Sequence, residues 1–94
     1  MFRVFKVTGD SMVPTLRDKD FVITSRWFLK PKVGQLVAVE HPEYQTIVKR
    51  ISQINEVDQL LLQGDNPKSV SSTRMGWITK DQVLGRVLFC VKQS

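Results

Sequence analysis

Short apolar stretches separated by turn residues run along the whole chain, and none keeps a helical period for ten residues or more. The stretches are rich in Val, Ile, Leu and Phe, which favour strands, and Gly, Pro, Asn and Asp separate them. Turns are expected at residues 30–34, 41–43, 55–59 and 64–67. The pattern predicts a mostly β fold, a coiled antiparallel sheet or partly open barrel. The predicted strands are Phe2–Val7, Phe21–Ser25, Leu36–Glu40, Thr46–Ile54, Leu60–Gln63, Trp77–Thr79 and Val83–Val91.

Length and composition indicate one globular domain over residues 1–94, with 41% hydrophobic and 24% charged residues. The 14 basic residues exceed the 9 acidic ones, which gives a net charge of +5. Such a surplus aids solubility and favours acidic partners or an anionic membrane surface. The basic residues are scattered and form no nucleic-acid motif, so binding to nucleic acid is not expected.

Several residue types limit the chemistry and the location of the protein. Cys90 is the sole cysteine, so it is expected to be a buried thiol rather than part of a disulfide. His41 is expected to be solvated in a turn, and without metal-ligand spacing no metal or cofactor is expected. No apolar run approaches a membrane span, so we predict a cytoplasmic protein, at most peripheral to a membrane. Trp27 and Phe28, between basic residues, would contact lipid, line a substrate cleft or close a core hairpin.

Ser11 stands in a sequence that suits a nucleophile, Gly9-Asp10-Ser11-Met12-Val13-Pro14-Thr15-Leu16. The serine follows a glycine-containing turn, and the residues behind it are expected to form a short helical turn. Backbone amides at such a position can donate to an oxyanion. Taken alone, the local pattern fits a helix cap better, since serine is a common capping residue.

Lys49 occupies an unusual position in a predicted strand. Alternation places it on the same face as Ile47 and Ile51, although lysine is seldom buried without a partner. Burial disfavours the ammonium and lowers the pKa of a lysine, which can then accept a proton from a serine hydroxyl. The alternative is a basic edge strand in which Lys49 extends to solvent beside Arg50.

Three segments in order resemble the conserved boxes of signal peptidase I and the LexA-type repressors, the S26 and S24 serine peptidases. Residues 11–16 resemble the nucleophile box, Ser-Met-x-Pro-Thr-Leu, and residues 48–51 look like the lysine box. Residues 64–67, with Arg74 and Gly76 after them, are similar to the third box, and residues 83–87 resemble the last strand. The resemblance implies the LexA/signal peptidase fold, with Ser11 as nucleophile and Lys49 as general base. The Ser11 N–H would form part of the oxyanion hole, with Asp10 as a further candidate.

The third box departs from the family pattern at two places. Val70 stands where a serine would support the lysine, and Ser72 stands where an aspartate is usual. Ser69 or Ser71 could replace the missing hydroxyl. The resemblance also implies that Met12 and Pro14 line the substrate cleft, although core filling is the simpler role for Met12. The supporting loop by resemblance comprises Asp65, Asn66, Ser69, Ser71, Ser72 and Arg74.

The sequence therefore predicts a serine endopeptidase with a Ser11–Lys49 dyad that cleaves a polypeptide substrate in trans. The sole alanine, Ala38, precedes Val39, so there is no Ala-Gly bond of the kind that LexA-type proteins cleave in themselves. The departures at the third box support an alternative, a peptide-binding or regulatory module with the same fold and little turnover. In size and box layout the chain resembles the compact maturation proteases of nickel superoxide dismutase.

Overall fold

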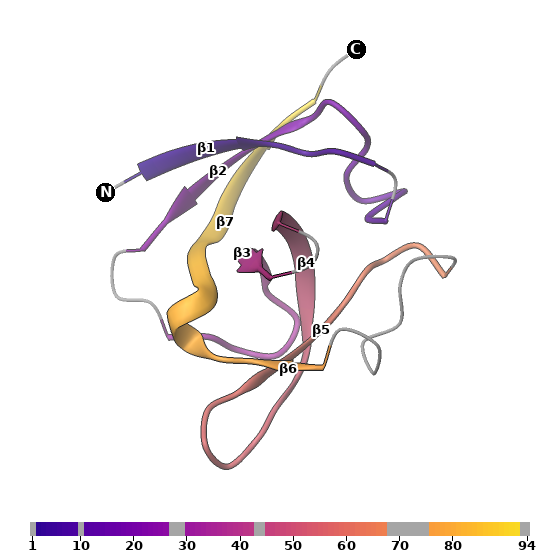
Figure 1. Cartoon of the computed structure of the whole chain (residues 1–94). Helices are drawn as coiled ribbons and strands as arrows, with labels where there is room; N and C mark the ends of the chain where they lie inside the picture. Colours follow the sequence, from indigo (N-terminus) through magenta and orange to yellow (C-terminus); the bar gives the residue numbers. More distant parts are fainter. Residues whose placement is uncertain (1, 10, 27–29, 43–44, 68–75, 93–94) are drawn as a thin grey trace.

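The computed structural model describes residues 2–9, 11–26, 30–42, 45–67 and 76–92, and for Gln45 the backbone alone. Seven strands form one antiparallel sheet in the order β1-β2-β7-β3-β4-β5-β6. Figure 1 shows the sheet curling, with β1 and β2 at one end, β3 and β4 in the middle, and β5 and β6 at the other end. The strands are β1 (Phe2–Lys6), β2 (Phe21–Ser25), β3 (Leu36–His41), β4 (Gln45–Ile54), β5 (Leu60–Gln63), β6 (Trp77–Ile78) and β7 (Val83–Val91).

The predicted mostly β fold is confirmed, and each predicted strand differs from the observed one by at most one residue at either end. Irregular pairing bends the sheet at three places: between β2 and β7 at Ile23/Thr24, between β3 and β7 at Ala38/Val39, and between β4 and β5 at Ile51/Gln53. Extra residues at such points increase local twist, which lets a single sheet curl into a partial barrel. None of the described segments forms a helix of the length and apolarity needed to cross a bilayer.

The core consists of two clusters on opposite faces of the β3–β4 hairpin. Val37, Val39 and Ile51 belong to the first cluster, whereas Ala38 and Val48 belong to the second. Adjacent residues alternate between the clusters because successive side chains of a strand point to opposite faces. The middle of the hairpin is thus buried on both sides. The second cluster also contains Val7, Met12, Leu16 and Val22, which attach the β1–β2 loop to the sheet.

Two sequence expectations about single residues need correction. His41 is the last residue of β3 and only 9% exposed, not a solvated turn residue. Its side chain lies on the same face of the strand as the buried Val37 and Val39, because alternate residues of a strand share a face. Cys90 is half-buried rather than fully buried, and it packs against the second cluster from the outer part of β7.

Gly85 allows β7 to pass close to β2. A Cβ at this position would lie 2.8 Å from the Thr24 Oγ1 and 2.9 Å from the Thr24 Cβ. Because Thr24 is buried, we expect Gly85→Ala to lower the free energy of unfolding by about 1–3 kcal/mol, the usual cost of overpacking. Urea unfolding measures the loss. The loss should be smaller in a Thr24→Gly background, and an equal loss in both backgrounds would contradict this explanation.

Candidate active site

Ser11 begins a series of turns in the loop that joins β1 to β2. Gly9, just before it, has a φ of +85°, which favours glycine, and its N–H donates to the Asp18 Oδ1 at 2.8 Å. The expected helical turn is reduced to a single hydrogen bond, from the Leu16 N–H to the Met12 carbonyl at 2.9 Å. The Val13–Pro14 peptide bond in this turn is cis. No described residue accepts a hydrogen bond from the Ser11 N–H.

Met12 attaches the turn that carries Ser11 to the second core cluster. Met12 is 1% exposed and belongs to the second cluster, so its expected place in the substrate cleft is wrong and core filling is its role. Met12 is buried because its unbranched, flexible side chain can fill the space between the Ser11 turn and the sheet. Pro14 is exposed at the tip of the turn.

A second anchor closes the loop at its far end. The buried Asp20 accepts a hydrogen bond from the Arg17 N–H at 3.0 Å and from the Lys92 ammonium at 3.2 Å. The same ammonium donates to the Thr15 carbonyl, so the residue after β7 ties both halves of the loop together. The turn that carries Ser11 is therefore fixed from two sides.

Lys49 is buried in β4, with 4% of its surface exposed. Within the described part of the chain no carboxylate forms an ion pair with it. Burial without a counter-charge lowers the pKa of the Lys49 ammonium below its ordinary value. Of its neighbours on the same side of the strand, Ile51 belongs to the first core cluster and Ile47 packs against it. Lys49 thus has the burial and the lowered pKa that the sequence predicted.

A small cavity connects the nucleophile turn to the lysine strand. It measures about 30 Å³ and is lined by Ser11, by residues 5–8 at the end of β1 and by residues 46–48 of β4. Ile47, on the same side of β4 as Lys49, is one of the lining residues. Lys49 therefore lies one alternate position along β4 from the wall of the cavity that Ser11 also lines.

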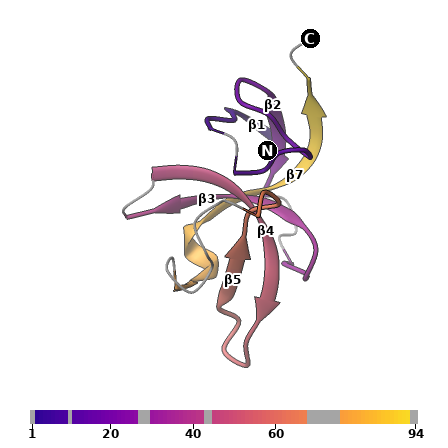
Figure 2. The same ribbon diagram turned by 90° about the vertical axis from the view of Figure 1, so that its right-hand side faces the viewer.

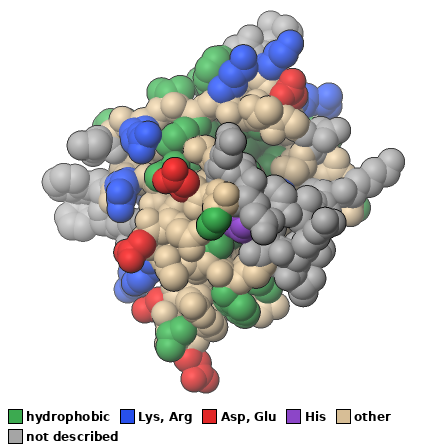
Figure 3. Space-filling model, viewed as in Figure 1, with side chains coloured by type: hydrophobic (Ala, Val, Ile, Leu, Met, Phe, Trp, Pro, Cys, Tyr) green, Lys and Arg blue, Asp and Glu red, His purple; other side chains and the backbone are tan. Residues whose placement is uncertain are grey.

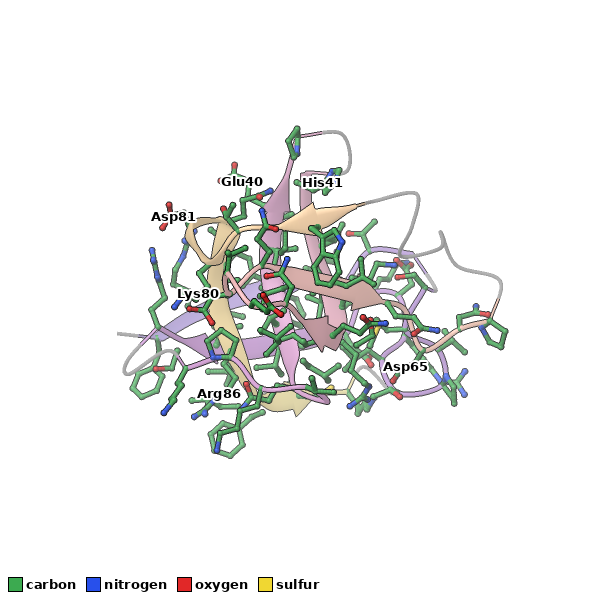
Figure 4. All side chains as sticks on the ribbon, turned by 90° about the horizontal axis from the view of Figure 1, so that it is seen from below. Glu40, His41, Asp65, Lys80, Asp81 and Arg86 are labelled. Atoms are coloured by element: carbon green, nitrogen blue, oxygen red, sulfur yellow. The ribbon has the colours of Figure 1, made fainter. Side chains whose placement is uncertain are left out.

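A larger concavity lies further along the same strand. It measures about 750 Å³ and shares Thr46 with the Ser11 cavity, but Ser11 does not line it. Figure 4 shows its residues Glu40, His41 and Asp81 near one end of the sheet, with Asp65 near the other end. We place the candidate active site at the small cavity because Ser11 lines it and Lys49 follows its lining residues in β4.

Asp65 joins the three boxes through its carboxylate. Arg50 donates from Nε to Oδ1 at 2.9 Å and from Nη2 to Oδ2 at 2.7 Å, and the Thr15 hydroxyl donates to Oδ2. The hydrogen bonds from Arg50 are the main reason that the pKa of Asp65 is lowered. Arg50 also donates to the Gly34 carbonyl at 2.8 Å. We call these three side chains the Thr15–Asp65–Arg50 clamp.

Backbone contacts reinforce this clamp. The Asn66 N–H donates to the Ser11 carbonyl at 2.8 Å, and the Asp65 N–H donates to the Met12 sulfur at 3.4 Å. Figures 1 and 2 show the β1–β2 loop and the segment after β5 on the same side of the molecule. The predicted supporting residues Asp65 and Asn66 thus contact the nucleophile turn directly.

Sequence reasoning missed Thr15 and Arg50 as supporting residues. The signal in the sequence was Arg50 itself, a second cation beside Lys49 in an apolar strand. A cation at such a position favours a carboxylate partner, but the sequence did not identify Asp65 as that partner. The predicted site residues Asp10, Ser69, Ser71, Ser72 and Arg74, and the predicted contacts Trp27 and Phe28, lie outside the described residues. No three metal-ligating side chains gather in the described ranges.

The described residues form a curled antiparallel sheet in which Asp65 joins the Ser11 turn, through Thr15, to Arg50, the neighbour of Lys49. The family model for Peptidase S24-like proteins matches residues 2–88, and the chain therefore belongs to this family. A comparison with curated proteins gave no significant match. Membership supports the serine peptidase class, whereas the narrower likeness to nickel superoxide dismutase maturation proteases stays a prediction.

Proposed function

We propose that this protein is a serine endopeptidase that cleaves a polypeptide in trans, with Ser11 as nucleophile and Lys49 as general base. The observation that carries the proposal is Lys49 itself, buried in an apolar strand with no described carboxylate partner. A lysine in this state has little structural value, because burying an unpaired ammonium is unfavourable. Its lowered pKa is the property that proton abstraction at neutral pH requires.

The reaction would follow the serine–lysine variant of acyl transfer. Neutral Lys49 takes the proton from the Ser11 hydroxyl as its oxygen attacks the peptide carbonyl. The Ser11 N–H stabilises the oxyanion, and the lysine returns the proton to the leaving amine. Water, activated by the same lysine, then releases the acyl group from Ser11.

Two strand edges that pair with no other described segment offer a place for an extended substrate. β1 is an edge strand that pairs with β2 alone, and residues 45–49 of β4 pair with β3 but not with β5. Both segments line the Ser11 cavity. A peptide can add to such edges through main-chain hydrogen bonds. The cavity has about the volume of one water molecule, which favours a small substrate side chain next to the scissile bond.

The position of Ala38 is in keeping with a substrate supplied in trans. Ala38 is completely buried between β4 and β7, so the bond that follows it cannot reach Ser11 without unfolding the middle of the sheet.

Covalent labelling of Ser11 tests the proposal. A penem ester should acylate the protein once, as intact mass shows, and labelling should rise between about pH 6 and about pH 10 as Lys49 loses its proton. Ser11→Ala should abolish the label. The matched control is Ser52→Ala, because Ser52 is a half-buried serine of β4 whose hydroxyl donates to the Leu61 carbonyl. Labelling that survives Ser11→Ala would overturn the assignment.

The departures at Val70 and Ser72 support one alternative, a peptide-binding module without efficient turnover. Such a module would bind peptides saturably, release no product and keep its affinity in Ser11→Ala. Absence of both labelling and cleavage, with retained peptide affinity, would favour this alternative over the peptidase.

A further inference from the structure

The outward side of β1, β2 and β7 exposes large apolar side chains. Phe2 is 70% exposed, Val4 62%, Phe89 65% and Val91 48%. Apolar side chains gathered in this way are uncommon on soluble monomers and often mark an interaction site. We call this side of the three strands, with Phe21 and Ile23 of β2, the apolar face.

Strand register makes the apolar face continuous. Val4 pairs with Ile23, which pairs with Phe89, and in the next row Phe21 pairs with Val91. Side chains at directly paired positions lie about 5 Å apart, so neighbouring side chains within each row are close enough to touch. The opposite sides of the same strands already serve the second core cluster, through Phe5, Val22 and Cys90. The apolar face is therefore not needed for the core of this chain.

Charge distinguishes the apolar face from ordinary surface. Among its paired positions there is no aspartate or glutamate, whereas Lys6 occupies the row of Phe21 and Val91. Arg86, paired with Ser25, stands at the border toward β3, and the exposed Arg26 follows β2. Figure 3 shows green and blue side chains together along the upper edge of the molecule, with one red side chain beside them.

We propose that the apolar face docks on an anionic lipid surface. Aromatic and aliphatic side chains flanked by lysine and arginine are the combination that interfacial binding uses, with the apolar groups at the acyl boundary and the cations at the headgroups. A second copy of this chain would bring Lys6 and Arg86 of two copies with a net charge of +5 toward one another. A protein partner would be expected to find more hydrogen-bonding groups than this face offers.

Docking would also orient the candidate active site. Lys6, the last residue of β1, lines the Ser11 cavity and also belongs, with Phe2 and Val4, to the docking side. The cleft would thus be held beside the lipid surface. This inference does not depend on catalysis, and it is tested without an activity measurement.

Co-sedimentation with vesicles tests the proposal. The protein should sediment with vesicles of phosphatidylcholine containing about a third of an anionic lipid and remain in solution with phosphatidylcholine alone. Binding should fall as salt is raised, because screening weakens the contribution of Lys6 and Arg86. Phe89→Thr should weaken partitioning roughly tenfold or more, since a whole aromatic side chain is removed from the contact.

Matched controls separate docking from general stickiness. Trp77→Thr removes an exposed aromatic of β6, and Val57→Thr removes a 72% exposed valine from the β4–β5 turn; neither should change partitioning. If Phe89→Thr disturbs folding, as circular dichroism would show, Val4→Thr and Lys6→Gln replace it. Equal binding to neutral vesicles, equal loss in the controls, or no binding to anionic vesicles would overturn the proposal. Self-association abolished by Phe89→Thr would likewise overturn it, in favour of a second copy.

Discussion

Replacing Lys49 by methionine is expected to abolish acylation of Ser11 and at the same time to make the domain more stable. Methionine keeps the length and flexibility of the side chain but carries no charge. Loss of the general base should slow acylation by roughly a thousandfold or more. Removal of the buried, unpaired ammonium relieves its desolvation cost, so the melting temperature should rise by roughly 4–8 °C for each kcal/mol relieved.

The gain in stability of Lys49→Met should depend on pH. In the unfolded chain the lysine keeps its proton up to about pH 10.4, whereas the folded protein releases it at lower pH because its pKa is lowered. Between these two pKa values the unfolded state binds more protons, so the stability of the unmodified protein rises with pH. The advantage of Lys49→Met should therefore be largest below the folded pKa of Lys49 and should shrink as pH rises from there toward the unfolded value of about 10.4.

Thermal unfolding by circular dichroism across this range, with penem labelling in parallel, measures both effects. The control is Lys80→Met, because Lys80 is a half-exposed lysine paired with Asp58 across 3.6 Å. It should leave labelling intact and the stability within about 0.5 kcal/mol. A Lys49→Met protein that still acylates, or that is less stable at every pH, would remove the basis for Lys49 as the base.

Asp65→Ala is expected to give the largest loss of stability among changes in the polar side chains near the site. The carboxylate accepts two hydrogen bonds from Arg50 and one from Thr15, and its side chain is 17% exposed. Truncation leaves these donors without their acceptor, which should cost about 2–4 kcal/mol, because hydrogen bonds to charged groups are stronger than neutral ones. Acylation should also slow, because the clamp connects the Ser11 turn to the strand of Lys49.

Asp65→Asn keeps the shape and removes the charge, so it isolates the ionic part of the clamp. Because the folded pKa of Asp65 is lowered, its contribution is complete above the unfolded value near 3.9 and disappears as pH falls through the folded pKa. The stability difference between the unmodified protein and Asp65→Asn should thus be constant at neutral pH and diminish below about pH 4.

Urea unfolding at neutral pH and in acid provides the measurement for both Asp65 variants. Asp58→Asn is the control, since Asp58 is 68% exposed in its ion pair with Lys80 and should contribute little. If Asp65→Ala costs no more than Asp58→Asn, or if the Asp65→Asn difference persists unchanged into acid, the clamp does not stabilise the site as proposed.

The strands could be read from the sequence because they rest on local preferences. β2, β5 and β7 were predicted to the residue, since each is a short apolar run bounded by polar or charged residues or glycine, such as Asp20 before β2 and Gly64 after β5. The burial of Lys49 was also predictable, because alternation with Ile47 and Ile51 determines its side of the strand. The helical turn after Ser11 was only partly correct, since tertiary contacts rather than helix propensity shape that loop.

The sequence by itself thus determined the strands, the burial of Lys49 and the order of the three boxes, because these depend on neighbours along the chain. Only the tertiary structure decided that β7 lies between β2 and β3, that Met12 is core and that Thr15, Asp65 and Arg50 meet. These contacts join residues up to 50 positions apart, and no local pattern specifies which donor meets which acceptor. The sheet curls around the two core clusters and thereby brings Thr15, Asp65 and Arg50 together. Contacts between residues so far apart in sequence close long loops, and the packing of the whole domain offsets the entropy that this closure costs.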